Sequence, residues 1–392
     1  MFQNKTNNNS FFLLILSMPF TFLIGSFFVN FIAILITFYT LILIAISKKT
    51  NIFFDKEYKF LFILFIIFLI SSSLSEYKLS SFENSFSFFS NIILFLALIL
   101  FFSEKHNEHK IFLLSKFVFF LTLFLCIDLW IQKISGNSIL GYPKQQAGRL
   151  TSIFKDEQIP GGVILKLSIF SIYYLFQNFK NKFLFNYKIL ILLFIYFSII
   201  ITGERSSIIL ASILFFLLVA LNFYSIPKKK LAIYASIFLF SFILLFNLKN
   251  SIIKERFYYT IEQSRDNIYF QLYNNGFEIF KDNIFFGTGP QSYRYECLKN
   301  NDICSTHPHN FLIELLSDGG FLSASILIIS LFSILLFKIK KIESRFLKSI
   351  IISYLIILFF PLIPTGSFFN SFHMTLTWFS LGFIFSLKKF NI

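Results

Sequence analysis

Three features of the sequence predict an all-α polytopic membrane protein. Of the 392 residues, 56% are hydrophobic, which is more than a soluble core of this size can bury. The apolar residues fall into blocks of about 16 to 28, separated by short charged breaks. Lys and Arg concentrate in alternate breaks, as expected for the two sides of a membrane. We therefore predict about 12 transmembrane helices in one integral membrane domain.

The apolar blocks define the predicted helices. Block 11–46 is too long for one span, so we expect two helices that turn near Asn30, and we do not expect residues 1–10 to begin a cleaved signal peptide. Each of ten later blocks predicts one span: 58–74, 86–102, 111–131, 161–176, 187–202, 206–223, 231–248, 311–337, 346–362 and 372–387. The chain then consists of nine helices in 1–248, a long loop in 249–309 and three helices in 310–392.

The basic residues predict how these helices are oriented. The formal charge is +15, and 21 of the 35 Lys and Arg residues fall on the side of the two termini. The positive-inside rule places that side in the cytoplasm and the loop 249–309 outside, in the periplasm of a bacterial inner membrane. Because the charge marks sidedness, we expect membrane lipids as partners and no nucleic acid.

Arg205 is the most informative charge outside the cytoplasm. It follows Gly203 and Glu204 in a turn between two apolar blocks, so its guanidinium lies near the membrane interface. One interpretation is an arginine that extends to the lipid headgroups or pairs with Glu204. The other is a fixed cation for a phosphate or diphosphate, to which Arg offers bidentate donors.

The loop 249–309 contains a predicted amphipathic helix that follows Arg265. Its apolar positions are Ile268, Tyr269, Leu272, Tyr273, Gly276, Ile279 and Phe280, with polar residues opposite, so it should lie on the membrane surface or over the bundle. Gly287 and Gly289 lie beyond it in a tight turn. They lack the Lys-Ser/Thr of a P-loop, so we expect no nucleotide site.

Two cysteines lie in this loop, Cys297 and Cys304. In an oxidising compartment they can form a disulfide that rigidifies the approach to the histidines. The alternative is a metal site, since Cys304, His307 and His309 have ligand-like spacing. We favour the disulfide and expect no metal, because Pro308 separates the histidines and no further ligand cluster is evident.

The segment His307-Pro308-His309-Asn310 joins the loop to the next apolar block. A neutral imidazole, with an ordinary pKa of about 6.5, is suited to taking a proton at neutral pH. The alternative is a histidine that satisfies the start of a helix. Asn310 is a natural N-cap before Phe311 and would help to orient the histidine beside it.

Taken together, these motifs resemble the O-antigen ligase and O-antigen polymerase superfamily. They are an exterior Gly-x-Arg-Ser at Gly203–Ser206, an arginine before an amphipathic helix, Phe-Phe-Gly-x-Gly-Pro at 285–290, and His-Pro-His-Asn before an apolar helix that ends in Ser-Asp-Gly-Gly at 317–320. The motif similarity covers roughly residues 202–320, and the first half of the chain matches mainly in hydropathy.

The resemblance implies a GT-C-like membrane glycosyltransferase that needs no metal or other cofactor. It implies a glycan donor on undecaprenyl diphosphate and an acceptor such as lipid A-core or another glycan. In the family pattern His309 is the catalytic base, Arg205 and Arg265 bind the diphosphate, and His307 and Asn310 support the base. Direct attack by the acceptor hydroxyl would invert the anomeric carbon.

Two other functions remain as alternatives. A polysaccharide polymerase of the same superfamily would share the architecture and these residues. A flippase for lipid-linked glycans would need charges distributed within many spans. We find the spans almost free of charge, with Lys166 inside one and Asp128 near the end of another, which favours the enzyme.

Overall fold

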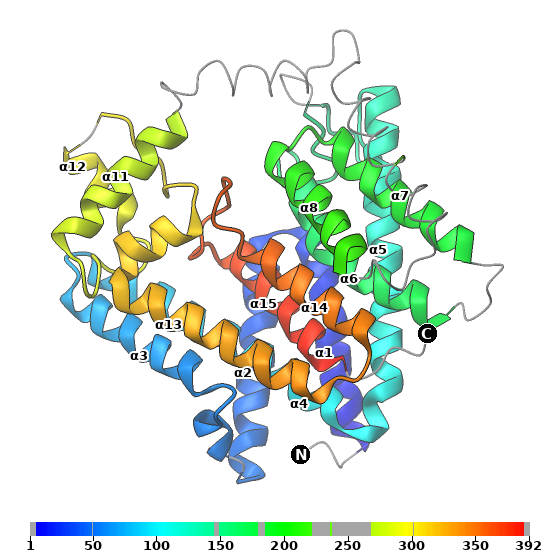
Figure 1. Cartoon of the computed structure of the whole chain (residues 1–392), viewed down its shortest axis with the longest axis horizontal. Helices are drawn as coiled ribbons and strands as arrows, with labels where there is room; N and C mark the ends of the chain where they lie inside the picture. The colour runs from blue at the N-terminus through cyan, green and yellow to red at the C-terminus, as the bar shows by residue number, and fades with distance from the viewer. Residues whose placement is uncertain are drawn as a thin grey trace. The chain divides into compact units, whose positions relative to one another are not determined.

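A computed structural model gives the fold of the chain (Figure 1). It describes residues 5–48, 50–144, 149–178, 185–221, 236, 268–300 and 302–387. Within these ranges the regular elements are all helical, and the only β-type pairing is an isolated bridge between Asn137 and Pro143. The chain divides into two compact units, which we call unit 1 (1–108, 265–341 and 359–386) and unit 2 (109–264, 342–358 and 387–392).

Unit 1 contains the first four helices and those that follow the long loop. These helices are α1 (Lys5–Ile24), α2 (Ser26–Ile46), α3 (Lys59–Leu74), α4 (Lys78–Ser103), α11 (Ile268–Asp282), α12 (Tyr293–Asn300), α13 (Phe311–Lys341) and α15 (Ser371–Ser386), with short 3-10 turns at Thr50–Phe54 and Lys105–Asn107. In Figure 1, α3 and α13 lie side by side and run in opposite directions.

The break between the first two helices is at Gly25, so the expected turn near Asn30 was wrong. Gly25 has φ +142° and ψ 172°, a conformation that only glycine adopts at little cost. Asn30 lies within α2, where the helix continues without interruption. The helix therefore breaks at the glycine, whose backbone can adopt this conformation, five residues before Asn30, the polar residue that suggested the turn.

The centre of unit 1 is the contact between α4 and α15. The indole of Trp378 is 1% exposed and lies between the rings of Phe88 and Phe95, with centroids 5.7 Å from each in edge-on geometry. Gly382 allows α15 to approach α4, because a Cβ there would lie 2.6 Å from Leu98 Cδ1. Aromatic packing of this kind holds the helices that support the site described below.

Unit 2 contains most of α5 (Glu108–Ser135) together with α6 (Pro160–Asn178), α7 (Phe185–Ile201), α8 (Arg205–Leu221) and α14 (Arg345–Leu358). The indole nitrogen of Trp130 in α5 donates to Ser198 Oγ of α7, at 3.1 Å. Ser168 of α6 and Tyr354 of α14 share a hydrogen bond of 2.5 Å between their hydroxyls. Polar pairs of this kind join helices whose remaining surfaces are apolar.

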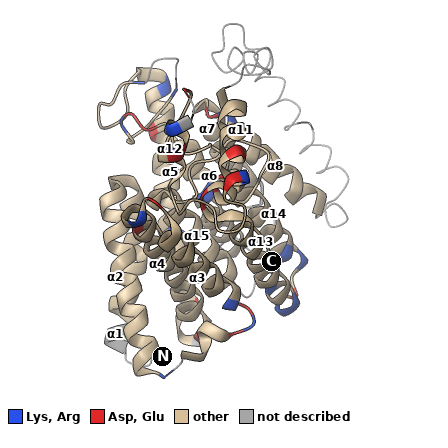
Figure 2. Ribbon diagram, turned by 90° about the vertical axis from the view of Figure 1, so that its left-hand side faces the viewer, with Lys and Arg blue, Asp and Glu red and all other residues tan. Residues whose placement is uncertain are grey.

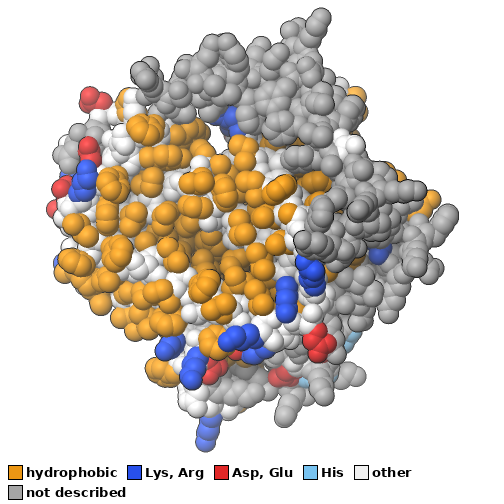
Figure 3. Space-filling view, in the orientation of Figure 1, with side chains coloured by type: hydrophobic (Ala, Val, Ile, Leu, Met, Phe, Trp, Pro, Cys, Tyr) orange, Lys and Arg blue, Asp and Glu red, His pale blue; other side chains and the backbone are white. Residues whose placement is uncertain are grey.

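In the part of the chain that the structure describes, four helices are long and apolar enough to cross a membrane: Ser26–Ile46, Lys78–Ser103, Glu108–Ser135 and Phe311–Lys341. Shorter apolar helices occupy most of the other predicted spans, while the expected span 231–248 lies outside the described residues. The total of 12 therefore remains a prediction. In unit 1, large apolar side chains stay exposed on α2 and α13, for example Phe27 (72%) and Phe332 (60%). Figure 3 shows hydrophobic side chains covering the face formed by α3 and α13.

Charged residues occur mainly in turns and at helix ends, and long stretches of helix carry none (Figure 2). At one end of α13, Lys341 pairs with Glu57, just before α3 begins. The histidine segment precedes the other end of α13. A protein that presents apolar helix surfaces between polar ends is suited to a lipid bilayer.

Candidate active site

The histidine segment ends in a well-formed helix cap. Asn310 Oδ1 accepts the backbone N–H groups of Leu312 (3.0 Å) and Ile313 (3.2 Å), so Asn310 is the N-cap of α13. Its side-chain nitrogen donates to the carbonyl of Pro361, at 2.6 Å. Asn310 thus fixes both the start of the helix and a second loop against it.

That second loop, residues 359–370, supports the histidine segment from the other side. Thr365 donates its backbone N–H to the carbonyl of His309 (2.8 Å), and its hydroxyl accepts the N–H of Phe311 (2.9 Å). Glu314, 1% exposed in the first turn of α13, accepts the Ser367 hydroxyl (2.5 Å) and the Phe368 N–H (2.6 Å). These bonds hold the backbone of His309 in place.

The His309 imidazole lies in a partly buried, polar and aromatic environment. Its Nε2 is 3.2 Å from Ser305 Oγ, its ring meets Tyr269 edge-on with centroids 5.4 Å apart, and the His307 ring is 4.1 Å away. Burial lowers the pKa of His309 below its ordinary value of 6.5. Burial, His309 and the charge of Arg294 lower the pKa of His307 to about 4. Both rings are therefore neutral at pH 7.

A disulfide between Cys297 and Cys304 links α12 to this segment, with Cα atoms 5.8 Å apart. It occupies the Cys304 sulfur that the alternative metal site would require. Among the described residues, no three His, Cys, Asp or Glu side chains are grouped as metal ligands. Asn275 of α11 donates to the carbonyl of Ile303, at 2.9 Å, so α11 also holds the disulfide-bonded loop.

Residues 317–320 form a break inside α13, so the first helical segment ends at this motif as expected and a second one follows it within the predicted span 311–337. Gly320 has φ +73°, and the helix continues to Lys341. The loop that carries Phe-Phe-Gly-x-Gly-Pro pairs with the break: Thr288 and Gly289 donate to the carbonyls of Ser317 and Asp318, and Phe321 donates to Ile284. Hydrogen bonds from the loop thus replace those lost within the helix.

Close backbone contact explains the glycines of these two motifs. A Cβ on Gly287 would lie 2.4 Å from the carbonyl carbon of Asp318, and a Cβ on Gly320 would lie 2.3 Å from the carbonyl oxygen of Phe285. Both glycines also have positive φ. Two motifs 30 residues apart in sequence thus form one structural unit.

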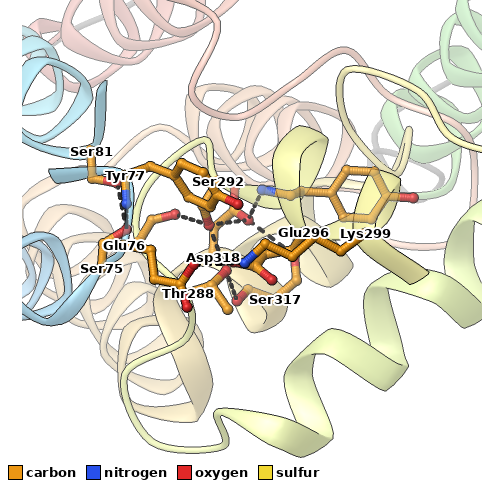
Figure 4. Close-up of polar contacts among 12 residues, drawn as sticks. Ser75, Glu76, Tyr77, Ser81, Thr288, Ser292, Glu296, Lys299, Ser317 and Asp318 are labelled. Carbon is orange, nitrogen blue, oxygen red and sulfur yellow. Dashed lines mark hydrogen bonds and ion pairs between the residues drawn. The ribbon is translucent and has the colours of Figure 1, made fainter. Parts of the chain in front are cut away.

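Asp318 anchors this unit to α12 (Figure 4). The residue is fully buried, and its Oδ1 accepts the N–H of Tyr293 at 2.8 Å. Ser292 and Ser317 lie 3.4 Å from the same oxygen. Because Tyr293 N–H begins α12, the carboxylate also stabilises a helix N-terminus.

A polar pocket lies against the same loop, with a volume of about 390 Å³. On one side of it, Lys299 of α12 pairs with Glu76 (2.7 Å) and Glu296 (3.1 Å), as Figure 4 shows. The lining residues are Leu74, Ser75, Glu76, Asp282, Asn283, Ile284, Phe285, Phe286, Gly287, Thr288 and Glu296. Carboxylates, an amide and a hydroxyl in an open pocket can hydrogen-bond a hydroxyl-rich ligand.

In unit 2, Arg205 is the first residue of α8, immediately after the α7–α8 turn. The Glu204 carboxylate accepts the N–H groups of Gly161 (2.7 Å) and Gly162 (3.1 Å) and the hydroxyl of Ser207 (2.8 Å). Because two of these donors are at the start of α6, Glu204 caps that helix. Burial raises the pKa of Glu204 to about 7 despite these hydrogen bonds.

A second arginine lies beside this turn. Leu150 donates its N–H to the carbonyl of Thr202 (3.4 Å), and Cγ of Arg149 is 4.0 Å from where a Cβ on Gly203 would be. Arg149 Nε is buried with no hydrogen-bond partner among the described residues. Asp128 and Gln132 of α5 hold the loop through the N–H groups of residues 139, 151 and 152.

The structure thus brings His307, His309 and Asn310 together in unit 1 and places Arg205 in unit 2, while Arg265 lies outside the described residues. The sequence interpretation missed Arg294, Glu314 and Asp318. It was also wrong that Lys166 and Asp128 were the main charges in the spans, because Glu314 and Asp318 are buried in α13. Their four-residue spacing, which places them on one helix face, was the available signal.

The fold and site define a helical membrane protein with a polar, histidine-containing centre at the head of a membrane-length helix. Residues 189–328 match the family model described as O-antigen ligase, so this segment of the chain is similar to that family. The matched segment contains the positions of Arg205, Arg265 and His309. No curated protein matches the chain. Members of this superfamily are ligase- or polymerase-type glycosyltransferases that act on lipid-linked glycans in a membrane.

Proposed function

We propose that this protein is a ligase that transfers a glycan from undecaprenyl diphosphate to lipid A-core or a similar acceptor, at the periplasmic face of the bacterial inner membrane. The observation that carries the proposal is the partly buried, neutral His309 directly before the N-cap Asn310 of α13, inside the segment that matches the O-antigen ligase family. A neutral imidazole in this setting is a suitable general base.

In the proposed reaction, His309 takes the proton from an acceptor hydroxyl as that oxygen bonds to the anomeric carbon. The bond from this carbon to the diphosphate oxygen breaks, and undecaprenyl diphosphate leaves with the electron pair. Attack from the face opposite the leaving group inverts the anomeric centre. Arg205 and Arg265 bind the diphosphate and stabilise its developing charge, so no metal is required.

Several contacts support these roles. Glu204 accepts hydrogen bonds from two N–H groups at the start of α6 and from Ser207 in the first turn of α8, so its neighbour Arg205 is not needed to satisfy it. Arg149 supplies a second cation beside Gly203. Glu314 and Asp318 accept hydrogen bonds from loops, which is a structural use of charge rather than a path for transport.

The test is a gel profile of surface and lipid-linked glycans in the native host lacking the gene. The host is complemented with the intact gene, with His309→Ala, or with His106→Ala, a control at a half-exposed histidine. We expect lipid-linked polymer to accumulate over bare core in the deletion strain. The intact gene and His106→Ala should restore transfer, and His309→Ala should lower it by about 100-fold or more.

Other outcomes separate the alternatives. A core carrying a single repeat in the deletion strain would identify a polymerase, and substrate trapped on the cytoplasmic face would identify a flippase. Full rescue by normally expressed His309→Ala would rule out His309 as the base.

A further inference from the structure

In unit 1, Arg294 Nε and His307 Nε2 are buried, and no described residue forms a hydrogen bond of good geometry with either. The backbone of Thr365 lies close enough to His307 to raise its pKa, against the larger effect of burial. Buried polar atoms of folded proteins are nearly always paired, so unpaired ones call for a ligand, an ion or a water. The other ring nitrogen of His307, Nδ1, is 3.0 Å from Thr306 Oγ1. When that hydroxyl donates to Nδ1, the neutral ring carries its proton on Nε2. Both orphan atoms are then donors.

These two donors belong to one cluster with the proposed base. Their sequence neighbours Tyr293 and Pro308 both lie against Gly276, because a Cβ there would be 3.5 Å from Tyr293 Cε2 and 3.5 Å from Pro308 Cβ. The His307 and His309 rings are 4.1 Å apart, and the charge of Arg294 also lowers the pKa of His307. The backbone around Arg294 is fixed, because the N–H of Tyr293 is bound to Asp318 and the disulfide at Cys297 lies three residues further on. The cluster is therefore preorganised.

An arginine and a neutral imidazole N–H together suit an oxyanion. The guanidinium supplies charge and several donors, and the imidazole adds one more donor at a fixed place. A phosphate or carboxylate bound there would satisfy both orphan nitrogens.

The proposed chemistry determines which substrate carries this oxyanion. In a direct displacement, the attacking hydroxyl and the leaving diphosphate lie on opposite sides of the anomeric carbon. The base that deprotonates the hydroxyl is on the side of the acceptor. A cation beside His309 is thus on the acceptor side and away from the diphosphate.

We propose that Arg294 and His307 bind a phosphate or carboxylate group of the acceptor, next to the hydroxyl that His309 deprotonates. This inference rests on the proposed transferase function. It makes the preferred acceptor an anionic glycolipid and makes Arg294 a residue that determines acceptor specificity.

The experiment uses the full chain in lipid nanodiscs, with lipid-linked glycan donor and glycolipid acceptor extracted from the host lacking the gene. The acceptor is used intact, after removal of phosphates with aqueous hydrofluoric acid, or after reduction of carboxylates with carbodiimide and borohydride. The KM for donor and for acceptor is measured with wild type, Arg294→Gln and Lys299→Gln. Lys299 is a matched control, because it lies in the same helix and pairs with Glu76 and Glu296 instead.

We expect one of the two treatments to raise the acceptor KM of wild type about 10-fold or more. A rise after phosphate removal identifies a phosphate as the bound group, and a rise after carboxylate reduction identifies a carboxylate. Arg294→Gln should raise the KM for intact acceptor by a similar factor and change the KM for the treated acceptor less than about 2-fold. Lys299→Gln should retain the wild-type preference. Inorganic phosphate should compete with the acceptor in wild type and should do so less in Arg294→Gln.

Three results would overturn the inference: equal acceptor KM values for all acceptors with wild type, an equal effect of Arg294→Gln on all acceptors, or a rise in donor KM alone. If Arg294→Gln fails to fold, the acceptor KM values of Arg294→Lys and of wild type, each with intact and treated acceptor, still test the inference. Absence of transfer by wild type to any acceptor would instead refute the proposed function, whereas transfer without preference would refute only this inference.

Discussion

His309 adopts a backbone conformation that is unusual for its residue type. Its φ is +55°, in the left-handed region that a non-glycine residue occupies only at some cost. The hydrogen bond from Thr365 to its carbonyl and the cap formed by Asn310 hold the segment in this conformation. Strain maintained by surrounding contacts is typical of functional residues, and here it directs the imidazole toward Ser305 and Tyr269.

The burial of His309 leads to a prediction about pH. The base acts when neutral, and burial against Tyr269 lowers its pKa, so the neutral form persists below pH 6.5. The transfer rate should therefore stay on its plateau at pH 6.5 and fall about tenfold per pH unit only below a midpoint that is lower than 6.5. Initial transfer rates measured across pH give this midpoint.

Tyr269→Ala should shift the midpoint upward, toward 6.5, because it exposes the imidazole to water. Tyr39→Ala is the matched control, since its ring stacks on Phe11 instead, with centroids 4.9 Å apart. The charged and titratable neighbours, His307 and Arg294, are unchanged in both variants. A wild-type midpoint above 6.5 would contradict the assignment of His309 as the base.

At the scale of elements, the broken helix α13 and the loop 284–290 form one unit. Neither satisfies its own hydrogen bonds: the break leaves carbonyls and N–H groups of α13 unpaired, and the loop pairs with them. Ser71 of α3 adds a hydrogen bond from its hydroxyl to the carbonyl of Phe286, at 2.6 Å. The glycines matter because they let two backbones touch, as expected where irregular backbone is buried among helices.

Gly320→Ala should destabilise the protein strongly. A Cβ would lie 2.3 Å from the carbonyl oxygen of Phe285, and φ is +73°, so the loop must move away from α13. We expect a loss of about 3 kcal/mol or more in the free energy of unfolding. The readouts are the thermal unfolding midpoint in detergent and protease cleavage within 284–310.

Gly141→Ala separates the two causes. Gly141 has a similar positive φ of +85°, yet nothing lies within 4 Å of its Cβ position, so only backbone strain of about 1 kcal/mol applies. Equal effects of the two substitutions would show that close contact between the loop and α13 adds nothing.

For the whole molecule, the ends of α13 test the predicted sidedness. The part of α13 after the break at Gly320, residues 321–341, spans about 32 Å as a helix, close to the roughly 30 Å of a bilayer core. Asp302, before the histidine segment, and Lys340, near the other end, are both exposed. We expect them on opposite sides of the membrane, with Asp302 in the periplasm.

Single cysteines at these positions provide the measurement, in a Cys126→Ser background that keeps the disulfide. A membrane-impermeant maleimide should label Asp302→Cys in intact spheroplasts and Lys340→Cys only after permeabilisation. Labelling of both in intact spheroplasts, or of Lys340→Cys alone, would contradict the positive-inside assignment of this helix.

Features that depend on neighbouring residues could be predicted from the sequence. The helical class follows from the length and spacing of apolar runs, and the cap at Asn310 from one side chain at a helix start. The resemblance to the O-antigen ligase family likewise follows from short local motifs. Such features need no knowledge of which distant segments meet.

The remaining features arise from contacts between residues far apart in the chain. Asp318 meets Tyr293 across 25 residues, Glu314 meets Ser367 across 53, and Gly320 meets the carbonyl of Phe285. Hydropathy treats such carboxylates only as interruptions of an apolar run. Their roles, and the place of Arg294 near His307, are set by tertiary packing, because a buried polar group acquires its function from the partner that folding brings to it.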